Sequence, residues 1–395
     1  MINPILLVIG TRAEAIKLIP LYLELKRSNI PVLLCATFQH FELLEEVFKI
    51  FDIIPDFNLK IMKKNQDLFY LQNTILEKTK EIYLKIKPSL ILVHGDTTTT
   101  MASALSAFYL SIPIGHVEAG LRTGNMRSPF PEEMNRKVVG QIATYHFAPT
   151  AFSAANLLSE GVKRENVFCT GNTIVDALFF MRSKIETQTI KIDRKIVQLI
   201  EQYKKHKQKI LLLTAHRRES FGAGLLRIFS AIKRFAQEKT DVIILYPYHP
   251  NPNVLKAIDE SGIRLVKNVV LLEPLSYKNL VYVLINCDII ATDSGGIQEE
   301  AVSLGKRVLI LRDITERWEG IWDGSEILVG TDENLILNSL YKFFSVSNLD
   351  IKPSMIYGDG NSCKRIVAIL KTKLKLDDQN LISYKYAKDM KAIFQ

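Results

Sequence analysis

Short runs of apolar and β-branched residues alternate with longer stretches of helical periodicity along the whole chain. Each run has the length of one buried strand, and each intervening stretch is long enough for a helix. Strands and helices that alternate in this way form parallel sheets covered by helices. The pattern predicts an α/β fold with strands at Ile5–Ile9, Val32–Ala36, Leu90–Val93, Ile112–Val117, Ile210–Thr214, Val242–Tyr246, Val269–Leu272, Ile289–Thr292 and Val308–Leu311.

The alternation is interrupted near Phe168–Asp176, and the polar helical stretch Thr187–Gln208 then precedes a new series of strands. A chain of 395 residues is also long enough for two ordinary cores. We therefore predict two doubly wound, Rossmann-like domains, residues 1–172 and 173–360, with an interdomain cleft that binds the ligand. Residues 361–395 are predicted to pack back on the first domain as a helix.

The composition, 47% hydrophobic and 24% charged residues, is that of a folded protein. The four cysteines form no C-x-x-C or Cys/His cluster, which argues against a zinc site and a disulfide framework. The first apolar run, Ile5–Ile9, is too short for a signal peptide or a membrane span. We therefore expect a cytoplasmic protein with no metal site and no membrane partner.

The formal net charge of +9 raises the possibility of nucleic acid binding. Lys and Arg are spread over many predicted helices, however, and no stretch interleaves them with exposed aromatic residues. An anionic small-molecule substrate and a solvated basic surface explain the charge equally well. We expect no nucleic acid partner.

The stretch from Leu90 to Arg136 contains three candidate catalytic acids, Asp96, Glu118 and Glu132. Asp96 and Glu118 each follow a predicted strand, at the edge where open parallel sheets bind ligands. Glu132 starts a predicted helix, where the helix dipole favours a carboxylate. One such acid is usually a solvated loop residue, but three near one edge indicate a functional site.

Two strand-to-helix loops have the chemistry of anion sites. In the loop from Gly10 to Lys17, Arg12 and Lys17 add positive charge near a helix N-terminus. This loop matches neither G-x-G-x-x-G nor a Walker A motif, which argues against nicotinamide and ATP. An ordinary turn is the alternative.

In the second loop, Gly295 and Gly296 leave room for a diphosphate to approach backbone N–H groups, and Ser294 can donate from the helix cap. Glu300 lies about one turn further on and can accept from both hydroxyls of a ribose. A capped helix with a surface Glu is the alternative.

Three further cations are candidates for phosphate or sugar oxygens. His216 and His249 follow strands at the same predicted edge, although a lone histidine is more often structural. Arg317 is a weaker candidate, with a surface salt bridge as its alternative.

These motifs resemble those of the non-hydrolysing UDP-N-acetylglucosamine 2-epimerases, which share the glycosyltransferase B architecture. The similarity extends from Ile5 to about Leu370. It rests on long motifs in the same order: GTRAEAIK, HGDTTTT, HVEAGLRTG, SPFPEEMNR, TGNT, HRRESFG, HPNPNV, DSGGIQEEA, TER and YGDG.

The resemblance implies interconversion of UDP-GlcNAc and UDP-ManNAc at C2, without a redox cofactor or an essential metal, by a homodimer. It implies anti elimination of UDP, a bound 2-acetamidoglucal, and re-addition of UDP with protonation from the other face. The C2 proton is weakly acidic, so its loss must accompany departure of a stabilised leaving group.

Matching positions one by one, the resemblance makes Asp96 and Glu118 the best candidates for the proton-transfer pair. Glu132 is a rival or partner that also holds the sugar, and His216 contacts phosphate or assists departure of UDP. The nucleotide and diphosphate positions are Arg12, Lys17, His249, Ser294, Gly295, Gly296, Glu300 and Arg317.

Two departures from the family pattern bear on the ligand. Trp318 stands where proline is usual, which either reshapes the pocket for another UDP-sugar, such as UDP-glucose or a UDP-diacetamido sugar, or changes packing only. A second, activating UDP-GlcNAc would use Gln39, His40 and Gln66, but two arginines that are common in that pattern are missing here.

Three other functions remain as alternatives. A hydrolysing epimerase would release free ManNAc and UDP, and a glycosyltransferase of the same fold would need an acceptor. The three acids argue against the transferase, because it needs at most one base. The ionisable groups retained at the matched catalytic positions argue against a regulator that binds the sugar nucleotide without turnover.

Overall fold

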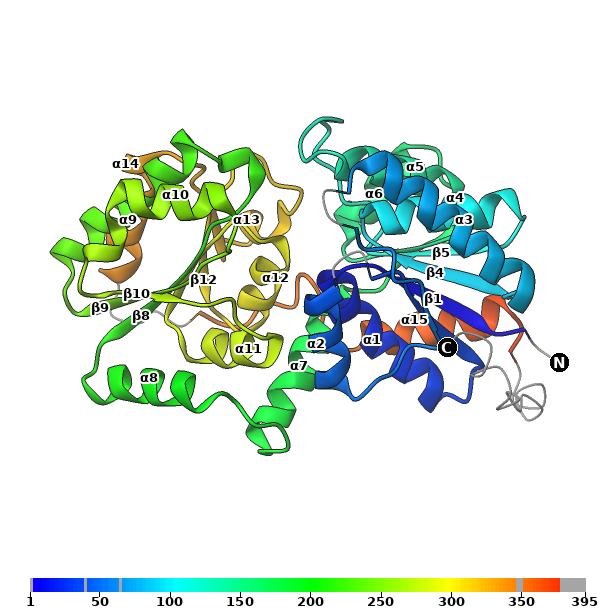
Figure 1. Ribbon diagram of the computed structural model, residues 1–395, viewed down its shortest axis with the longest axis horizontal. Coiled ribbons are helices and arrows are strands. Elements are labelled where there is room, and N and C mark those ends of the chain that lie inside the picture. The colour runs from blue at the N-terminus through cyan, green and yellow to red at the C-terminus, as the bar shows by residue number, and fades with distance from the viewer. Residues whose placement is uncertain (1–2, 39–40, 64–65, 346–350, 377–395) are drawn as a thin grey trace. The chain divides into compact units, whose positions relative to one another are not determined.

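The computed structural model describes residues 3–38, 41–63, 66–345 and 351–376. The chain divides into two compact units, Met1–Ala177 with Gly358–Gln395, and Leu178–Tyr357. Each unit contains one parallel sheet with helices on both faces (Figure 1). Within the described residues, no helix is both long enough and apolar enough to span a membrane.

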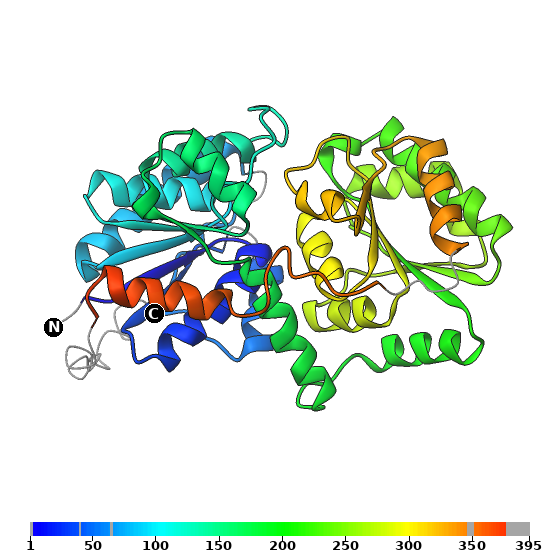
Figure 2. The same cartoon turned by 180° about the vertical axis from the view of Figure 1, so that it is seen from behind.

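Among its described residues, the first unit has a seven-stranded sheet in the order β3-β2-β1-β4-β5-β6-β7. On one face α3 packs against α4 and α4 against α5, and on the other α1 packs against α2 and α15 (Figures 1 and 2). The strands are β1 (Ile5–Ile9), β2 (Val32–Ala36), β3 (Phe57–Asn58), β4 (Leu90–His94), β5 (Ile114–Val117), β6 (Tyr145–Ala148) and β7 (Val167–Cys169), and the helices are α1 (Arg12–Arg27), α2 (Phe41–Phe51), α3 (Leu68–Ile86), α4 (Thr98–Tyr109), α5 (Glu132–Ile142), α6 (Ala151–Ser159) and α15 (Ser362–Lys373). Helix α7 (Thr173–Glu186) begins in this unit and continues into the second.

The described part of the second unit has a six-stranded sheet in the order β10-β9-β8-β11-β12-β13. Helices α10 and α14 pack against α9 on one face, and α8 packs against α11 on the other (Figure 1). The strands are β8 (Lys209–Thr214), β9 (Val242–Pro247), β10 (Val269–Leu272), β11 (Ile289–Thr292), β12 (Arg307–Ile310) and β13 (Glu326–Leu328), and the helices are α8 (Arg194–Lys205), α9 (Ala223–Glu238), α10 (Pro252–Ser261), α11 (Tyr277–Asn286), α12 (Gly295–Ser303), α13 (Glu319–Trp322) and α14 (Glu333–Phe344).

The predicted fold class is confirmed by the two parallel sheets with flanking helices. The central strands are mostly apolar because helices cover both faces of each sheet, and all of β1, β2 and β4 is buried. Every predicted strand is present, with some ends shifted. The sequence did not predict β3, β6, β7 or β13, of which β3, β7 and β13 are short edge strands.

The interruption predicted near Phe168–Asp176 contains the end of β7 and the start of α7. Strand β7 ends at Cys169 and α7 begins at Thr173, so the division between the units, after Ala177, falls inside a helix. Helix α15 returns the chain to the first unit, where it packs against α1.

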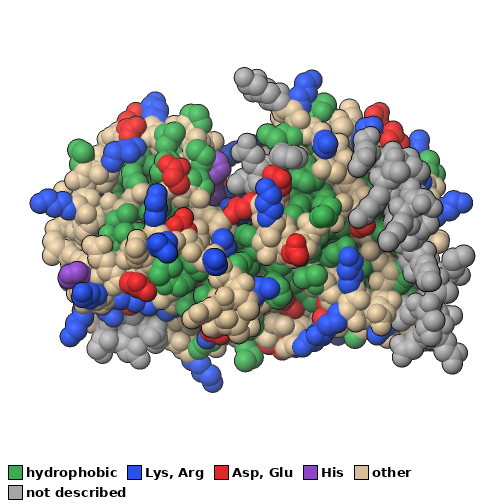
Figure 3. All heavy atoms as spheres, turned by 60° about the horizontal axis from the view of Figure 1, so that its bottom comes forward, with side chains coloured by type: hydrophobic (Ala, Val, Ile, Leu, Met, Phe, Trp, Pro, Cys, Tyr) green, Lys and Arg blue, Asp and Glu red, His purple; other side chains and the backbone are tan. Residues whose placement is uncertain are grey.

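The basic side chains are dispersed on the face of the molecule shown in Figure 3, where Lys and Arg alternate with acidic, polar and apolar groups. The described residues on this face form no continuous basic stripe of the kind that binds a nucleic acid backbone.

Candidate functional site

Two of the predicted acids lie at the carboxyl edge of the first sheet. Strands β4 and β5 pair in parallel, and Asp96 and Glu118 follow their ends. Glu132 starts α5, the helix whose Asn135 and Arg136 contact Asp96. The sheet and one helix therefore bring these three acids to one region of the first unit.

Glu118 is held by polar groups from several elements. Its Oε2 accepts a hydrogen bond from Asn172 Nδ2 at 2.6 Å and forms an ion pair with the Lys17 ammonium. Nε2 of His94 lies 3.7 Å from the same oxygen, and burial lowers the pKa of His94 to about 4, so this ring is neutral at pH 7. Glu118 is thus a buried carboxyl group whose described contacts include the ammonium of Lys17.

The backbone at Glu118 is unusual as well. Its φ of 62° lies in the left-handed region, which non-glycine residues adopt at a cost of about 1–3 kcal/mol. Such strain concentrates at functional sites, because surrounding contacts must hold it. The sequence identified Glu118 but gave no indication of this conformation.

Lys17 and Asn172 have roles that the sequence did not predict. Lys17 was placed among the diphosphate positions, whereas its ammonium lies on Glu118 in the structure. Asn172 belongs to the TGNT motif. Nothing about an asparagine in this motif indicated a contact with Glu118, which lies 54 residues earlier in the chain.

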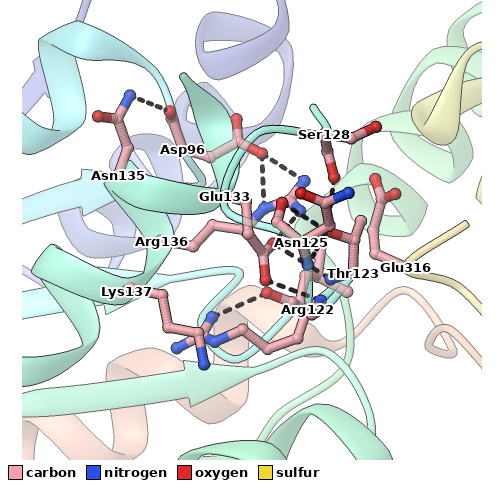
Figure 4. A network of polar contacts seen from close by, with 12 residues as sticks. Asp96, Arg122, Thr123, Asn125, Ser128, Glu133, Asn135, Arg136, Lys137 and Glu316 are labelled. Atoms are coloured by element: carbon pink, nitrogen blue, oxygen red, sulfur yellow. Dashed lines mark hydrogen bonds and ion pairs between the residues drawn. The ribbon is translucent and has the colours of Figure 1, made fainter. Parts of the chain in front are cut away.

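Asp96 forms a second charged cluster with α5 (Figure 4). Its Oδ2 lies 2.7 Å from Arg136 Nη2 and 2.9 Å from Arg136 Nε, and its backbone oxygen accepts from Asn135 Nδ2 at 2.7 Å. A guanidinium does not release its proton at physiological pH. Arg136 therefore places a fixed positive charge beside the Asp96 carboxylate.

Glu133 extends this cluster to the loop that follows Glu118. Its fully buried carboxylate lies 3.0 Å from Arg136 Nη1 and accepts the backbone N–H groups of Thr123 and Gly124, each at 3.1 Å (Figure 4). The sequence analysis selected its neighbour Glu132 instead. The order of residues does not show the phase of the helix, which decides that Glu133 is buried.

Glu14 joins the loops that carry Arg12 and Asp96. Its buried carboxylate accepts from the backbone of Thr11 at 2.7 Å and from the hydroxyls of Thr97 and Thr100 at 2.7 and 2.9 Å. Burial raises the pKa of Glu14, and these hydroxyl contacts lower it. This residue holds the end of β1 beside the start of α4.

In the second unit, the glycine-rich loop begins α12. Ser294 is the N-cap residue, but its side chain makes no cap hydrogen bond among the described residues. A Cβ at Gly296 would have no described heavy atom within 4 Å, whereas a Cβ at Gly295 would overlap the Arg317 guanidinium. Gly296 therefore leaves open space at the helix N-terminus, and Gly295 makes room for a side chain of the protein.

Arg317 is part of a buried ion-pair cluster, and the expected alternative of a surface salt bridge is wrong. Its Nε lies 2.7 Å from Glu299 Oε1, and Glu316 forms a second ion pair with it. The nearby Glu300 is also buried and accepts the Tyr277 hydroxyl at 2.9 Å. Glu299 and Glu300, which are adjacent on α12, thus each have a defined partner.

His216 and His249 lie side by side at the carboxyl edge of the second sheet. Their rings stack with centroids 5.5 Å apart and planes inclined by 18°. Nδ1 of His249 accepts the backbone N–H of Asn251 at 3.2 Å, so the neutral His249 ring carries its proton on Nε2. The backbone N–H of His216 is held by Asp293 at 2.5 Å.

The segment around Trp318 departs from the family pattern and has a packing role in part. Trp318 is half-buried, whereas Trp322 is 62% exposed. Gly320 lies against the carboxyl group of Glu326, and a Cβ there would overlap it. Burial raises the pKa of Glu326 to about 8, so this acid is largely neutral at pH 7.

Of the three residues considered for a second, activating UDP-GlcNAc, the structure describes one. Gln39 and His40 lie outside the described residues, and Gln66 accepts the backbone N–H of Lys63 at 3.2 Å. In the described part of the chain, no group of three or more His, Cys, Asp or Glu is arranged to hold a metal ion.

Known proteins match this chain over nearly its whole length. A family model described as UDP-N-acetylglucosamine 2-epimerase matches residues 23–371. The UDP-N-acetylglucosamine 2-epimerase of Salmonella typhimurium is 46% identical over 374 residues, which cover 93% of this chain and 98% of that protein.

Solved structures agree with this match. The UDP-GlcNAc 2-epimerase of Neisseria meningitidis, solved with UDP-GlcNAc bound, has a TM-score of 0.87 and 42% identity, covering 94% of this chain and 100% of that one. The S. aureus MnaA–UDP co-structure has a TM-score of 0.87 and 38% identity, covering 98% and 99%.

Proposed function

The chain belongs to the UDP-N-acetylglucosamine 2-epimerase family, and on that premise we propose that it interconverts UDP-GlcNAc and UDP-ManNAc at C2. UDP leaves C1 with the electron pair of the C1–O bond while a carboxylate takes the C2 proton, which forms a 2-acetamidoglucal. UDP then adds back to C1, and a second acid delivers a proton to the other face of C2.

The observation that carries this proposal is the pair of acids with different cationic partners. Asp96 lies on Arg136, which keeps its proton, and Glu118 lies on Lys17, which can exchange one. Asp96 therefore acts as the base on one face, and Glu118 with Lys17 supplies the proton to the other. These roles reverse in the opposite direction of the reaction.

The leaving UDP is bound by the second unit. The N-terminal amides of α12, beside the open side of Gly296, are suited to a diphosphate, and His216 and His249 add polar ring nitrogens at the same sheet edge. Stabilisation of the leaving group makes removal of a weakly acidic proton feasible.

Incubation with UDP-GlcNAc in D2O tests the activity. We expect UDP-ManNAc that carries deuterium at C2, detected by NMR and mass spectrometry. Release of free ManNAc and UDP would instead indicate a hydrolysing enzyme. If UDP-GlcNAc is unchanged and UDP-glucose or a UDP-diacetamido sugar is turned over in a parallel panel, the enzyme has a different substrate. That result would indicate that the segment around Trp318 reshapes the pocket.

Substitution of Glu300→Ala tests the ribose contact. We expect UDP to bind more weakly by about 1–3 kcal/mol, because hydroxyls that the carboxylate accepts would lose their partner. Calorimetric titration with UDP measures this difference. Tyr277→Phe is the matched control, since it removes the hydroxyl bonded to Glu300 and keeps the carboxylate. Equal UDP affinity in Glu300→Ala and the wild type would remove Glu300 from the site.

We also propose that the enzyme works in the cytoplasm as a homodimer. Helices α3 and α4 pack together and expose large apolar side chains, Phe69 and Leu84 on α3 and Phe108 and Tyr109 on α4. Exposed apolar groups of this kind are typical of protein interfaces. Sedimentation velocity should give the mass of two chains, and substitution of Phe108 and Tyr109 by Ser should reduce it to one.

A further inference from the structure

Asp293 is a buried carboxylate with one oxygen engaged and one oxygen unused. Its Oδ2 accepts the backbone N–H groups of His216 and Arg217 at 2.5 and 2.7 Å. Its Oδ1 has no hydrogen-bond partner among the described residues and lies 3.6 Å from Nδ1 of His216. A buried carboxylate oxygen without a donor is unfavourable, and the nearby ring nitrogen can supply one.

The sheet explains why these two residues meet. Strands β8 and β11 pair in parallel with Thr214 opposite Thr292, so the residues after them emerge at the same edge. Asp293 donates its backbone N–H to Thr214 at 3.1 Å, and the Tyr246 hydroxyl donates to the Ala215 carbonyl at 2.8 Å. The backbone that carries His216 is therefore held from both neighbouring strands.

We propose that Asp293 is the positioning residue of His216: it anchors the backbone of the histidine loop and keeps a proton on Nδ1. Nε2 is then the nitrogen that takes a proton and donates it in a hydrogen bond to an oxygen of the leaving diphosphate, and the proposal rests on the function proposed above. His249, stacked on the face of the ring, restricts its rotation.

The chemistry of the carboxylate sets this tautomer. An ionised Asp accepts hydrogen bonds and donates none, so it favours the ring form in which Nδ1 is the donor. The side chain of His216 is 39% exposed, which lets the ring close the 3.6 Å separation when an anion binds at Nε2. Asp293 also begins the loop that leads into α12, so one residue links the histidine to the proposed diphosphate site.

The variant Asp293→Asn separates the two parts of this role. Its side-chain oxygen can still accept the backbone N–H groups of His216 and Arg217, so the loop stays anchored. Its amide presents a donor to Nδ1, which then becomes an acceptor and moves the ring proton to Nε2. We expect the fold and the affinity for UDP to be retained, within about threefold, and kcat to fall by about 100-fold or more.

The tautomer is read directly from ¹⁵N chemical shifts of the full chain labelled in its histidines, with the His216 signals identified by their loss in His216→Asn. We expect the Nδ1–H form in the wild type and the Nε2–H form in Asp293→Asn. The matched control is Asp288→Asn, at the opposite end of β11, where Asp288 Oδ2 accepts the Ile210 N–H at 2.7 Å. This control should keep the wild-type tautomer and kcat.

An Nε2–H ring in the wild type, or the same tautomer in the wild type and Asp293→Asn, would overturn the proposal. Equal losses of kcat in Asp293→Asn and Asp288→Asn would overturn it too, because they would reveal a general effect on the sheet. The tautomer is measured without substrate. It therefore tests the role of Asp293 even if the wild type fails to epimerise UDP-GlcNAc, which would count against the proposed function alone.

Discussion

Glu118→Gln is expected to abolish formation of C2-deuterated UDP-ManNAc from UDP-GlcNAc in D2O while leaving UDP affinity unchanged. The amide has nearly the shape of the carboxylate, but it neither takes nor returns a proton under these conditions. A positioned acid or base contributes about 10²- to 10⁴-fold to a reaction, and epimerisation needs one on each face of C2. We therefore expect a loss of at least that size.

NMR of the sugar nucleotide pool measures this loss, and calorimetry with UDP measures the affinity. Asp96→Asn should behave in the same way, because Asp96 serves the other face. Glu160→Gln is a suitable control, since Glu160 is an acid of the same unit that pairs with Arg122 at 2.7 Å and with Lys137 and is not among the candidate catalytic acids. Wild-type epimerisation by Glu118→Gln would remove Glu118 from the mechanism.

Lys17→Met is expected to lower the free energy of unfolding by about 3–5 kcal/mol. Lys17 and Glu118 are only 6% and 7% exposed, so removal of the ammonium leaves a buried carboxylate without its cation. Asn172 and the neutral His94 ring, which also lie at Glu118, supply polar contacts but no positive charge. Few single substitutions in this unit should have a larger effect.

Urea denaturation of the single and double variants measures the coupling between the two residues. The double variant Lys17→Met with Glu118→Gln removes both charges, so we expect it to be more stable than Lys17→Met alone by about 2 kcal/mol or more. A loss in the double variant equal to the sum of the two single losses would show that the ion pair is not coupled, contrary to this prediction.

The amino-acid sequence alone determined the α/β class, the main strands and the positions of Asp96 and Glu118 at strand ends. These features are local, because a buried parallel strand must be apolar on both faces and the loop residues that follow it need not be. The glycines and serine before α12 were recognised in the same way, from the chemistry of a helix N-terminus.

The tertiary structure decided which groups these residues contact. Lys17 and Glu118 are separated by 101 residues and His216 and Asp293 by 77. The fold of the first sheet brings helix α1 to the residue after β5, and the strand order of the second sheet places the loops of His216 and Asp293 at one edge. Alternation of strands and helices does not specify that order. Likewise, the phase of α5 decided that Glu133 is buried against Arg136, a contact that the sequence did not predict. Side-chain partners at the site therefore follow from strand order and helix phase, which local sequence patterns do not encode.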